Sequence, residues 1–463
     1  MSQQIQVQEI GKYVERLKES INTNKIDNWT IEVNRIRRNN IYGENNYKIE
    51  SLLNSNREDI SITVFKKFGD EIGENTFEIS SSDSLDKFEM ELNDAITSCS
   101  IAKNKKYELP KENDRLLNDT DIDYDKLYSK KFLNEFENNN ISIFIGEKLE
   151  LLKKLIDEYS NDGIKVKLNA FEFLNSLNEN SLITSYNIQK EFKNQKTYCE
   201  LVLTAIRKDK KETEHIVYKN ISDIYNFDFE SFFREEIETT LGTATATRAK
   251  NYNGKIILSG EATNNFFNPD ISMNKLVAVA SGRLKYQKIF SYNIGDKLIN
   301  NKKDSINITI DAFYPNNSAS RPYDNLGIVG KKNFIIKDNT INNIIASKQF
   351  ADYLNEEPSG PMGVICIDCG NKSYNELKKD EEFIEIVSFS SFNPDVVSGD
   401  FSAEIRLGYH YKNGSKQSFK GGLFTGNILK LLEDVELSSE KKEDVGYVGP
   451  KHIKFYNGEI VGF

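Results

Sequence analysis

The chain has 463 residues, of which 38% are hydrophobic and 11% aromatic, and its formal net charge is −10. This composition excludes a disordered chain, because so many aromatic side chains can bury enough apolar surface to fold. The negative charge argues against nucleic acid or an anionic membrane as the main partner, since both attract basic surfaces. No apolar run reaches the roughly 18 residues of a transmembrane helix, and the polar start lacks the apolar segment of a signal peptide. Four cysteines are too few for a disulfide framework, so we expect a cytoplasmic protein of two or three domains.

Residues 1–102 are predicted to form an N-terminal α+β domain. Apolar residues recur at helical spacing from Ile10 to Ile21, which indicates a first helix. Strand-like stretches follow at 28–37, 46–54, 60–68 and 74–80. Ser82 or Asp83 is then expected to cap a second helix, whose buried face is Leu85, Phe88, Leu92, Ile96 and Cys99.

Residues 103–125 are polar and without a clear pattern, so we expect a linker there. A middle domain with long antiparallel strands is predicted over residues 126–225. Its elements are a helix near 147–159 and strands near 164–175, 181–192, 196–207 and 213–219.

The last part of the chain, residues 226–463, is expected to be a separate α+β domain with a mixed or antiparallel sheet. Prolines mark the change, because one lies in the first 268 residues and seven lie in the last 195. A helix begins this part near Phe229, a strand follows at 255–258, and further helices are expected near 341–354 and 427–433. The fold class predicted for the whole chain is therefore α+β.

Few residues suggest chemistry by their pattern alone. The three histidines, His215, His410 and His452, lie far apart and in no motif. Cys366 and Cys369 form a CxxC pair, but the surrounding residues predict a β-strand that places the two thiols on opposite faces. A single CxxC pair also supplies only half of the ligands of a zinc ribbon, and the sequence has no second pair. No phosphate-binding loop, serine nucleophile elbow or HExxH motif is present.

The last third carries a pattern that resembles a known family. Ser398-Gly-Asp-Phe-Ser402 precedes a strand, then Lys412-Asn-Gly414, then the helix-like run from Thr425 to Leu432. This order resembles the C-terminal signature of the TldD/PmbA family. The segments Ile335–Ile345, Lys348–Leu354 and Gly449–Phe455 also look like parts of that family. The details are closer to the PmbA branch, also called TldE, than to TldD.

TldD-type subunits resemble zinc metalloproteases and carry HExxxH at a helix start just after a strand. The matching segment here is Ser259-Gly-Glu-Ala-Thr-Asn-Asn265. Glu261 takes the place of the family's glutamate, whereas Gly260 and Asn265 replace its two histidines, and the family's cysteine ligand has no counterpart near 388–398. The resemblance therefore implies no zinc, no other cofactor and no assigned catalytic residue. Glu261 is interpreted as a carboxylate stabilised at a helix N-terminus rather than as a general base.

The resemblance implies a metal-free, TldE-like subunit of a TldD/TldE-type peptidase that acts on unfolded or extended peptides. Its expected partner is a TldD-like, zinc-binding subunit or a second copy of the chain, with neither nucleic acid nor membrane as a partner. The turn with Ser398, Gly399, Asp400 and Ser402 is the candidate wall of a peptide cleft. Residues 403–408 depart from the family's small-residue run. Two alternatives stay open: a stand-alone hydrolase using Glu261, and a regulator that modulates DNA gyrase.

Overall fold

The computed structural model describes residues 2–160, 163–268 and 274–462, with side chains described from residue 11 onward. Over these ranges, strands occur mostly in consecutive runs with helices between the runs, and the strands assemble into three sheets. Two sheets contain both parallel and antiparallel pairs. The predicted α+β class is therefore confirmed.

The first half of the chain builds one long, antiparallel sheet. Its strands are β1 (Asn28–Glu44), β2 (Ser51–Phe68), β3 (Glu71–Ile79), β4 (Lys103–Lys105), β5 (Ile164–Thr184), β6 (Gln189–Arg207) and β7 (Glu212–Ile221). They lie in the order β4-β3-β2-β1-β5-β6-β7. The stretches expected as strands 46–54 and 60–68 are one continuous strand, and the four strands expected over 164–219 are three longer ones.

This sheet crosses the boundary that the sequence suggests between an N-terminal and a middle domain. β1 pairs with β5 from Thr30 opposite Thr184 to Glu44 opposite Ala170. The two regions therefore share a single sheet, although more than a hundred residues of sequence separate their strands. Periodicity within a segment carries no information on such pairing.

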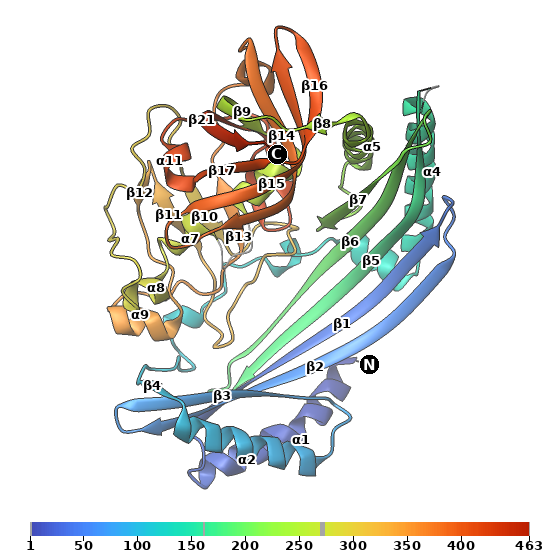
Figure 1. Ribbon diagram of the computed structural model, residues 1–463. Helices are drawn as coiled ribbons and strands as arrows, with labels where there is room; N and C mark the ends of the chain where they lie inside the picture. The colour runs from blue at the N-terminus through green and yellow to red at the C-terminus, as the bar shows by residue number, and fades with distance from the viewer. Residues whose placement is uncertain (1, 161–162, 269–273, 463) are drawn as a thin grey trace.

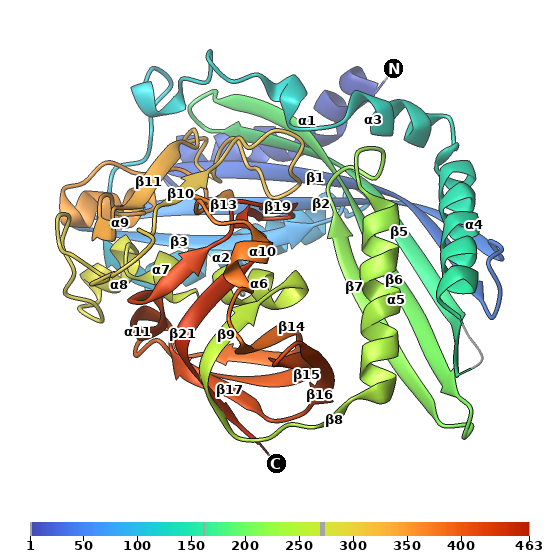
Figure 2. The same cartoon turned by 90° about the horizontal axis from the view of Figure 1, so that it is seen from above.

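Five of the described helices accompany this sheet: α1 (Ser2–Asn22), α2 (Leu85–Ile101), α3 (Lys130–Glu137), α4 (Ile141–Tyr159) and α5 (Phe229–Thr245). They cover one face, here called the outer face, which carries Val33 and Ile41. The sheet curves around the C-terminal part of the molecule with its other, concave face (Figures 1 and 2). The cap of α2 is Ser84, one or two residues later than expected, because its hydroxyl accepts the Lys87 N–H. Ile10 lies outside the described side chains.

Residues 103–125 are more ordered than the expected linker. They contain β4 and a 3₁₀ turn at Arg115–Leu117, and a second turn follows at Tyr124–Lys126. Tyr107 and Leu109 are buried against Leu326 and Ile328. This segment is therefore packed between the long sheet and the C-terminal part.

The C-terminal part contains the other two sheets. Its strands are β8 (Thr247–Arg248), β9 (Tyr252–Leu258), β10 (Ile308–Asp311), β11 (Lys332–Lys337), β12 (Thr340–Ile341), β13 (Val364–Ile367), β14 (Glu382–Pro394), β15 (Asp400–Lys412), β16 (Ser415–Lys420), β17 (Leu423–Asn427), β18 (Val435–Leu437), β19 (Lys441–Asp444), β20 (Tyr447–Pro450) and β21 (Ile453–Val461). One sheet has the order β12-β11-β10-β13-β20-β19. In the other, β14, β9, β21, β17 and β15 form a closed ring, because β14 pairs with both β9 and β15.

Short helices connect these strands: α6 (Gly260–Phe267), α7 (Lys275–Ala278), α8 (Gly282–Tyr286), α9 (Lys348–Leu354), α10 (Tyr374–Leu377) and α11 (Ile428–Leu432). The helix expected near 341–354 begins only at Lys348, because Thr340–Ile341 belongs to β12. One large apolar core joins both C-terminal sheets and includes Phe266, Phe424 and Phe455. Among the helices that the structure describes, none combines the length and apolar character needed to cross a bilayer.

Candidate functional site

Glu261 lies in the first turn of α6, directly after the buried strand β9. Its Oε1 is 2.9 Å from Lys219 Nζ on β7 and 3.5 Å from Lys442 Nζ on β19. Asp444 Oδ1 lies 2.5 Å from Lys219 Nζ, and Asp444 Oδ2 lies 2.9 Å from Lys442 Nζ. These four residues, here called the four-charge cluster, join the long sheet to the C-terminal part.

The cluster holds Glu261 in its ionised form. Burial disfavours the charged carboxylate, but the ammonium groups of Lys442 and Lys219 outweigh burial and lower the pKa of Glu261 well below its ordinary value. The pKa of Lys219 is raised in turn, since Glu261 and Asp444 outweigh the burial that would lower it. A general base acts best when its pKa is near the operating pH. Glu261 is therefore poorly tuned to abstract a proton.

The residues around Glu261 do not fit a zinc ion. Gly260 has a φ of +57°, which is unfavourable for residues with a side chain, and a Cβ there would lie 3.1 Å from the Val387 carbonyl oxygen. Asn265 offers an amide, which is a poor zinc ligand. Over the described ranges, no group of three or more histidine, cysteine or carboxylate side chains is placed to hold a metal. The two lysines already supply positive charge at Glu261.

A second polar cluster lies next to Glu261 and was not anticipated from the sequence. Ser259 Oγ donates to Glu385 Oε1 at 2.7 Å and lies 2.8 Å from His452 Nδ1. The hydroxyls of Tyr374 and Tyr411 also donate to Glu385. The His452 ring stacks on Tyr374 at a centroid distance of 3.9 Å, and burial lowers the pKa of His452 to about 3.

This serine, histidine and glutamate do not form a catalytic relay. In such a relay the histidine lies between the other two groups, whereas here Ser259 contacts both His452 and Glu385. All three residues are buried, with 4%, 6% and 4% exposure for Ser259, His452 and Glu385. The cluster therefore anchors the junction of β9 and α6. No sequence signal could have found it, because its members come from four distant segments.

The turn at residues 398–402 is tightly hydrogen-bonded. Gly399 has a φ of +82°, and Asp395 Oδ1 accepts the Ser398 N–H at 2.6 Å. Asn427 Nδ2, at the start of α11, donates to Ser398 O at 3.0 Å and to Asp400 Oδ1 at 2.9 Å. These bonds explain why a Gly-Asp pair occurs here and why an Asn begins the following helix.

The candidate turn and Glu261 have separate sets of partners. Ser402 lies in β15 opposite Thr425 of β17 and Asn393 of β14. Among the described residues, the polar partners of Glu261 belong to the four-charge cluster and to its own helix. The contacts therefore do not unite the two places that the sequence selects.

The histidines and cysteines form no common site. His215 Nε2 is 2.8 Å from Glu236, and His410 Nε2 is 2.9 Å from Glu382. Cys366 lies in β13, but Cys369 follows the end of that strand, so the expectation of two strand residues on opposite faces is wrong. Burial raises the pKa of the Cys366 thiol to about 11, which keeps it protonated and unreactive.

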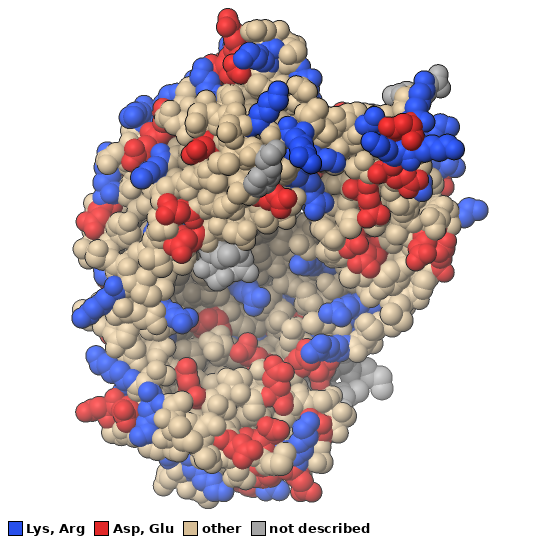
Figure 3. All heavy atoms as spheres, viewed as in Figure 1, with Lys and Arg blue, Asp and Glu red and all other residues tan. Residues whose placement is uncertain are grey.

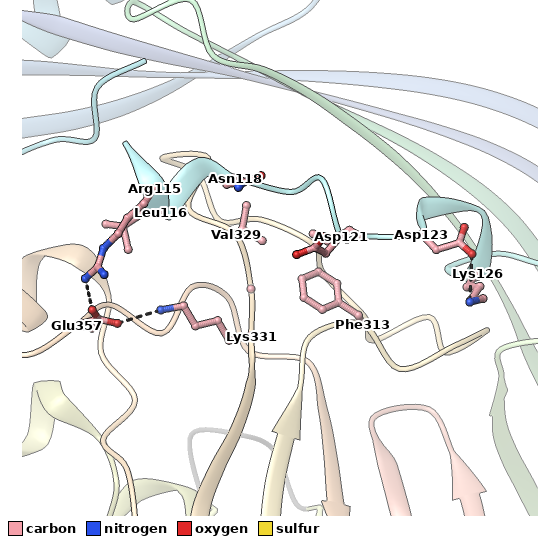
Figure 4. Close-up of a pocket in the computed structure, with 12 residues that line it drawn as sticks. Arg115, Leu116, Asn118, Asp121, Asp123, Lys126, Phe313, Val329, Lys331 and Glu357 are labelled. Atoms are coloured by element: carbon pink, nitrogen blue, oxygen red, sulfur yellow. Dashed lines mark hydrogen bonds and ion pairs between the residues drawn. The ribbon is translucent and has the colours of Figure 1, made fainter. Parts of the chain in front are cut away.

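A cavity of about 570 Å³ lies between residues 115–126 and the loops of the C-terminal part. On one side, Glu357 is paired with both Arg115 and Lys331 (Figure 4). Phe313 and Asp121 lie on the other side of this cavity (Figure 4). A second cavity, of about 390 Å³, is lined by residues of the 403–408 stretch that departs from the family pattern, among others.

Residues 253–462 match the family described as the PmbA/TldA metallopeptidase C-terminal domain. An uncharacterised protein of Methanocaldococcus jannaschii is 20% identical over 312 residues, which cover 62% of this chain and 71% of that protein.

Solved structures share the fold over nearly the whole chain. A proposed modulator of DNA gyrase from Bacteroides thetaiotaomicron superimposes with a TM-score of 0.76 and 15% identity, covering 96% of this chain and 97% of that one. TldE from Thermococcus kodakarensis gives a TM-score of 0.71 and 17% identity, covering 96% of this chain and 100% of that one. A proposed modulator of DNA gyrase from Thermotoga maritima superimposes with a TM-score of 0.71 and 15% identity, covering 98% of this chain and 100% of that one. Residues 253–462 therefore match the C-terminal domain of the family that the sequence resembles, and the whole chain shares its fold with these solved structures.

Proposed function

We propose that this chain is a metal-free, TldE-like subunit of a cytoplasmic TldD/TldE-type peptidase. The observation that carries the proposal is the helix start at Gly260–Glu261, where a left-handed glycine replaces a ligand and two lysines neutralise the carboxylate. Its partner would be a TldD-like subunit that holds the zinc ion, with a second copy of this chain as the alternative. The complex would act on unfolded or extended peptides.

The proposed contribution of this chain is to complete the complex and to form part of the peptide cleft. An extended peptide can bind by adding a strand to a sheet edge, with main-chain hydrogen bonds that tolerate many sequences. The turn with Ser398, Gly399, Asp400 and Ser402 is the proposed wall of that cleft. Its rigidity supports this role, because a fixed turn gives a peptide a preformed surface.

Assembly and cleavage test the proposal together. The purified chain should contain no stoichiometric zinc and should not cleave unstructured peptides. Mixed with a TldD-type subunit from the same source, it should form a stable complex in size-exclusion chromatography and raise the cleavage rate. A zinc content near one per chain, or failure to associate with any TldD-type subunit, would contradict it.

Glu261→Gln separates this proposal from a stand-alone hydrolase. The mixed enzyme should keep its rate, because the proposed zinc site belongs to the partner chain. A general base in this chain would instead lose about 100-fold or more. Glu235→Gln is the matched control, since Glu235 forms an exposed ion pair with Lys451. Hydrolysis by the lone chain that disappears in Glu261→Gln, with the fold intact, would show that this chain is the catalyst.

A further inference from the structure

The concave face of the long sheet carries two cations for which the described part of the chain provides no carboxylate partner. Arg38 on β1 lies opposite Ser176 on β5, and Ser176 lies opposite Lys196 on β6. Directly opposed residues share a face of a sheet. These three residues, here called the cationic row, cross the middle of the concave face. Within the described ranges, neither Arg38 nor Lys196 forms an ion pair, and burial alone accounts for the lowered pKa of Lys196.

Carboxylates near this part of the sheet do not neutralise the row. Glu179 lies on the outer face, where it is paired with Arg37 and Lys193. On the concave face, Glu172 and Glu200 oppose each other four residues along from the row. At about 3.3 Å per residue they are roughly 13 Å away, beyond a Debye length of about 8 Å at physiological salt.

The concave face around the row is hollowed and remains open. Figure 3 shows a depression between the C-terminal part and the long sheet, with both basic and acidic side chains in and around it. Lys196, Ser176, Asn40 and Leu174 are all half-buried, and Arg38 is exposed. The Asn40 side-chain oxygen has no hydrogen-bond partner within the described part of the chain, although it is buried. A recessed, polar surface on which two described cations, Arg38 and Lys196, have no ion-pair partner is typical of a binding surface.

We propose that the cationic row binds a carboxylate of an extended peptide that lies in this hollow. Arg38 and Lys196 are two strands apart, about 10 Å between their backbones, so both long side chains can reach one carboxylate above the small Ser176. The Ser176 hydroxyl donates to Lys196 O. This bond holds the serine side chain against the backbone of the sheet and leaves space above it. Half-buried Leu174, two residues along β5, offers an apolar contact for a neighbouring peptide side chain. The inference rests on the proposed function, because it assigns part of the peptide surface to this chain.

The carboxylate could come from a peptide C-terminus or from an acidic side chain. Three fluorescent ten-residue peptides of glycine, serine and tyrosine separate these sources: one with a free C-terminus, one amidated with a single Glu, and one amidated without Glu. Fluorescence anisotropy with the isolated chain should show binding of the peptide with the free C-terminus or of the peptide with Glu. Added salt should lower that affinity. Equal affinity for all three, or tighter binding of a thymidine decamer through the same residues, would overturn the inference.

Variants test the residues themselves. Lys196→Gln and Arg38→Gln should each lower the affinity for the carboxylate peptide by about tenfold, as expected when a hydrogen bond to a charged group is lost. Lys196→Arg should keep most of the affinity. Lys167→Gln is the control, because it removes the same charge from an exposed position on β5. Circular dichroism and melting temperature check that each variant is folded, and affinities unchanged from those of the control would refute the proposal. The isolated chain is used throughout, so these results are independent of whether a TldD-type partner binds.

Discussion

Glu261 shows how the charges around a carboxylate set its chemistry. Its carboxylate is held by Lys219 and Lys442, which are in turn held by Asp444. The two positive and two negative charges compensate each other. Removing one charge leaves the others with incomplete partners in a largely buried position, which is the costly case for ion pairs.

Glu261→Gln is expected to lower the free energy of unfolding at pH 7 by about 1–2 kcal/mol, a range reduced because water screens the partly exposed carboxylate. The folded-state pKa of Glu261 is lowered. Its stabilisation is therefore fully present above the unfolded pKa of about 4.3 and is lost as the pH falls further. Urea unfolding at pH 7, 5 and 3.5 should show a difference from the wild type that shrinks in acid.

Glu235→Gln serves as the control for this measurement, because its exposed pair with Lys451 should contribute no more than about 0.5 kcal/mol. A Glu261→Gln difference that is absent at pH 7, or that grows in acid, would contradict the role of the four-charge cluster.

Gly260 gives a second prediction at the scale of a residue. Gly260→His places a side chain at a φ of +57° and should lower the free energy of unfolding by about 1–2 kcal/mol. Asn265→His, in the following turn of α6, is the control and should lower the free energy of unfolding by less. The double variant should bind no stoichiometric zinc after dialysis, as measured by elemental analysis. Tight zinc binding with unchanged stability would show that the backbone here suits a metal site.

At the scale of elements, close contact between a strand and a helix depends on single glycines. Gly73 in β3 lies against the last turn of α2, where an added Cβ would come within 1.9 Å of the Cys99 carbonyl oxygen. Gly146 in α4 has open space at the same position. The same substitution should therefore have opposite effects at the two sites.

Gly73→Ala is expected to lower the free energy of unfolding by about 2 kcal/mol, because α2 must move away from the sheet. Gly146→Ala should raise it by up to about 1 kcal/mol, since alanine favours a helix over glycine. Urea denaturation of both variants provides the measurement. Equal effects at the two positions would show that the contact between β3 and α2 is looser than described.

The whole molecule is organised by the long sheet rather than by consecutive domains. β5 lies between β1 and β6, so the region from residue 126 onward has a central strand whose partner comes from the first fifty residues. Without β1, that strand becomes an exposed edge, which promotes association between chains.

A chain that begins at residue 126 should therefore fail to fold as a stable monomer. We expect aggregation in size-exclusion chromatography and no cooperative transition in thermal unfolding, in contrast to the full-length chain. A monomer with a sharp transition would establish residues 126–463 as an independent folding unit.

Local patterns in the sequence predicted local structure well. Helical spacing located α2, and Phe88, Leu92 and Cys99 of its expected face are buried. Ile96 is half-buried, and the expectation for Leu85 is wrong, because this residue at the helix start is exposed. The lengths of β2 and β5 were underestimated, because both strands continue through polar residues. Such residues interrupt the apolar pattern but still pair in a sheet with neighbours from other segments.

The sequence by itself determined the fold class, the resemblance to a family and the absence of histidines at the two matched positions, because each depends on residue type or short-range order. Only the tertiary structure decided that Lys219 and Lys442 neutralise Glu261, and that Ser259 meets His452 and Glu385. It also aligned Arg38 with Lys196 across three strands. These arrangements depend on contacts between segments far apart in the chain, and no local preference specifies which distant charge or strand becomes a neighbour.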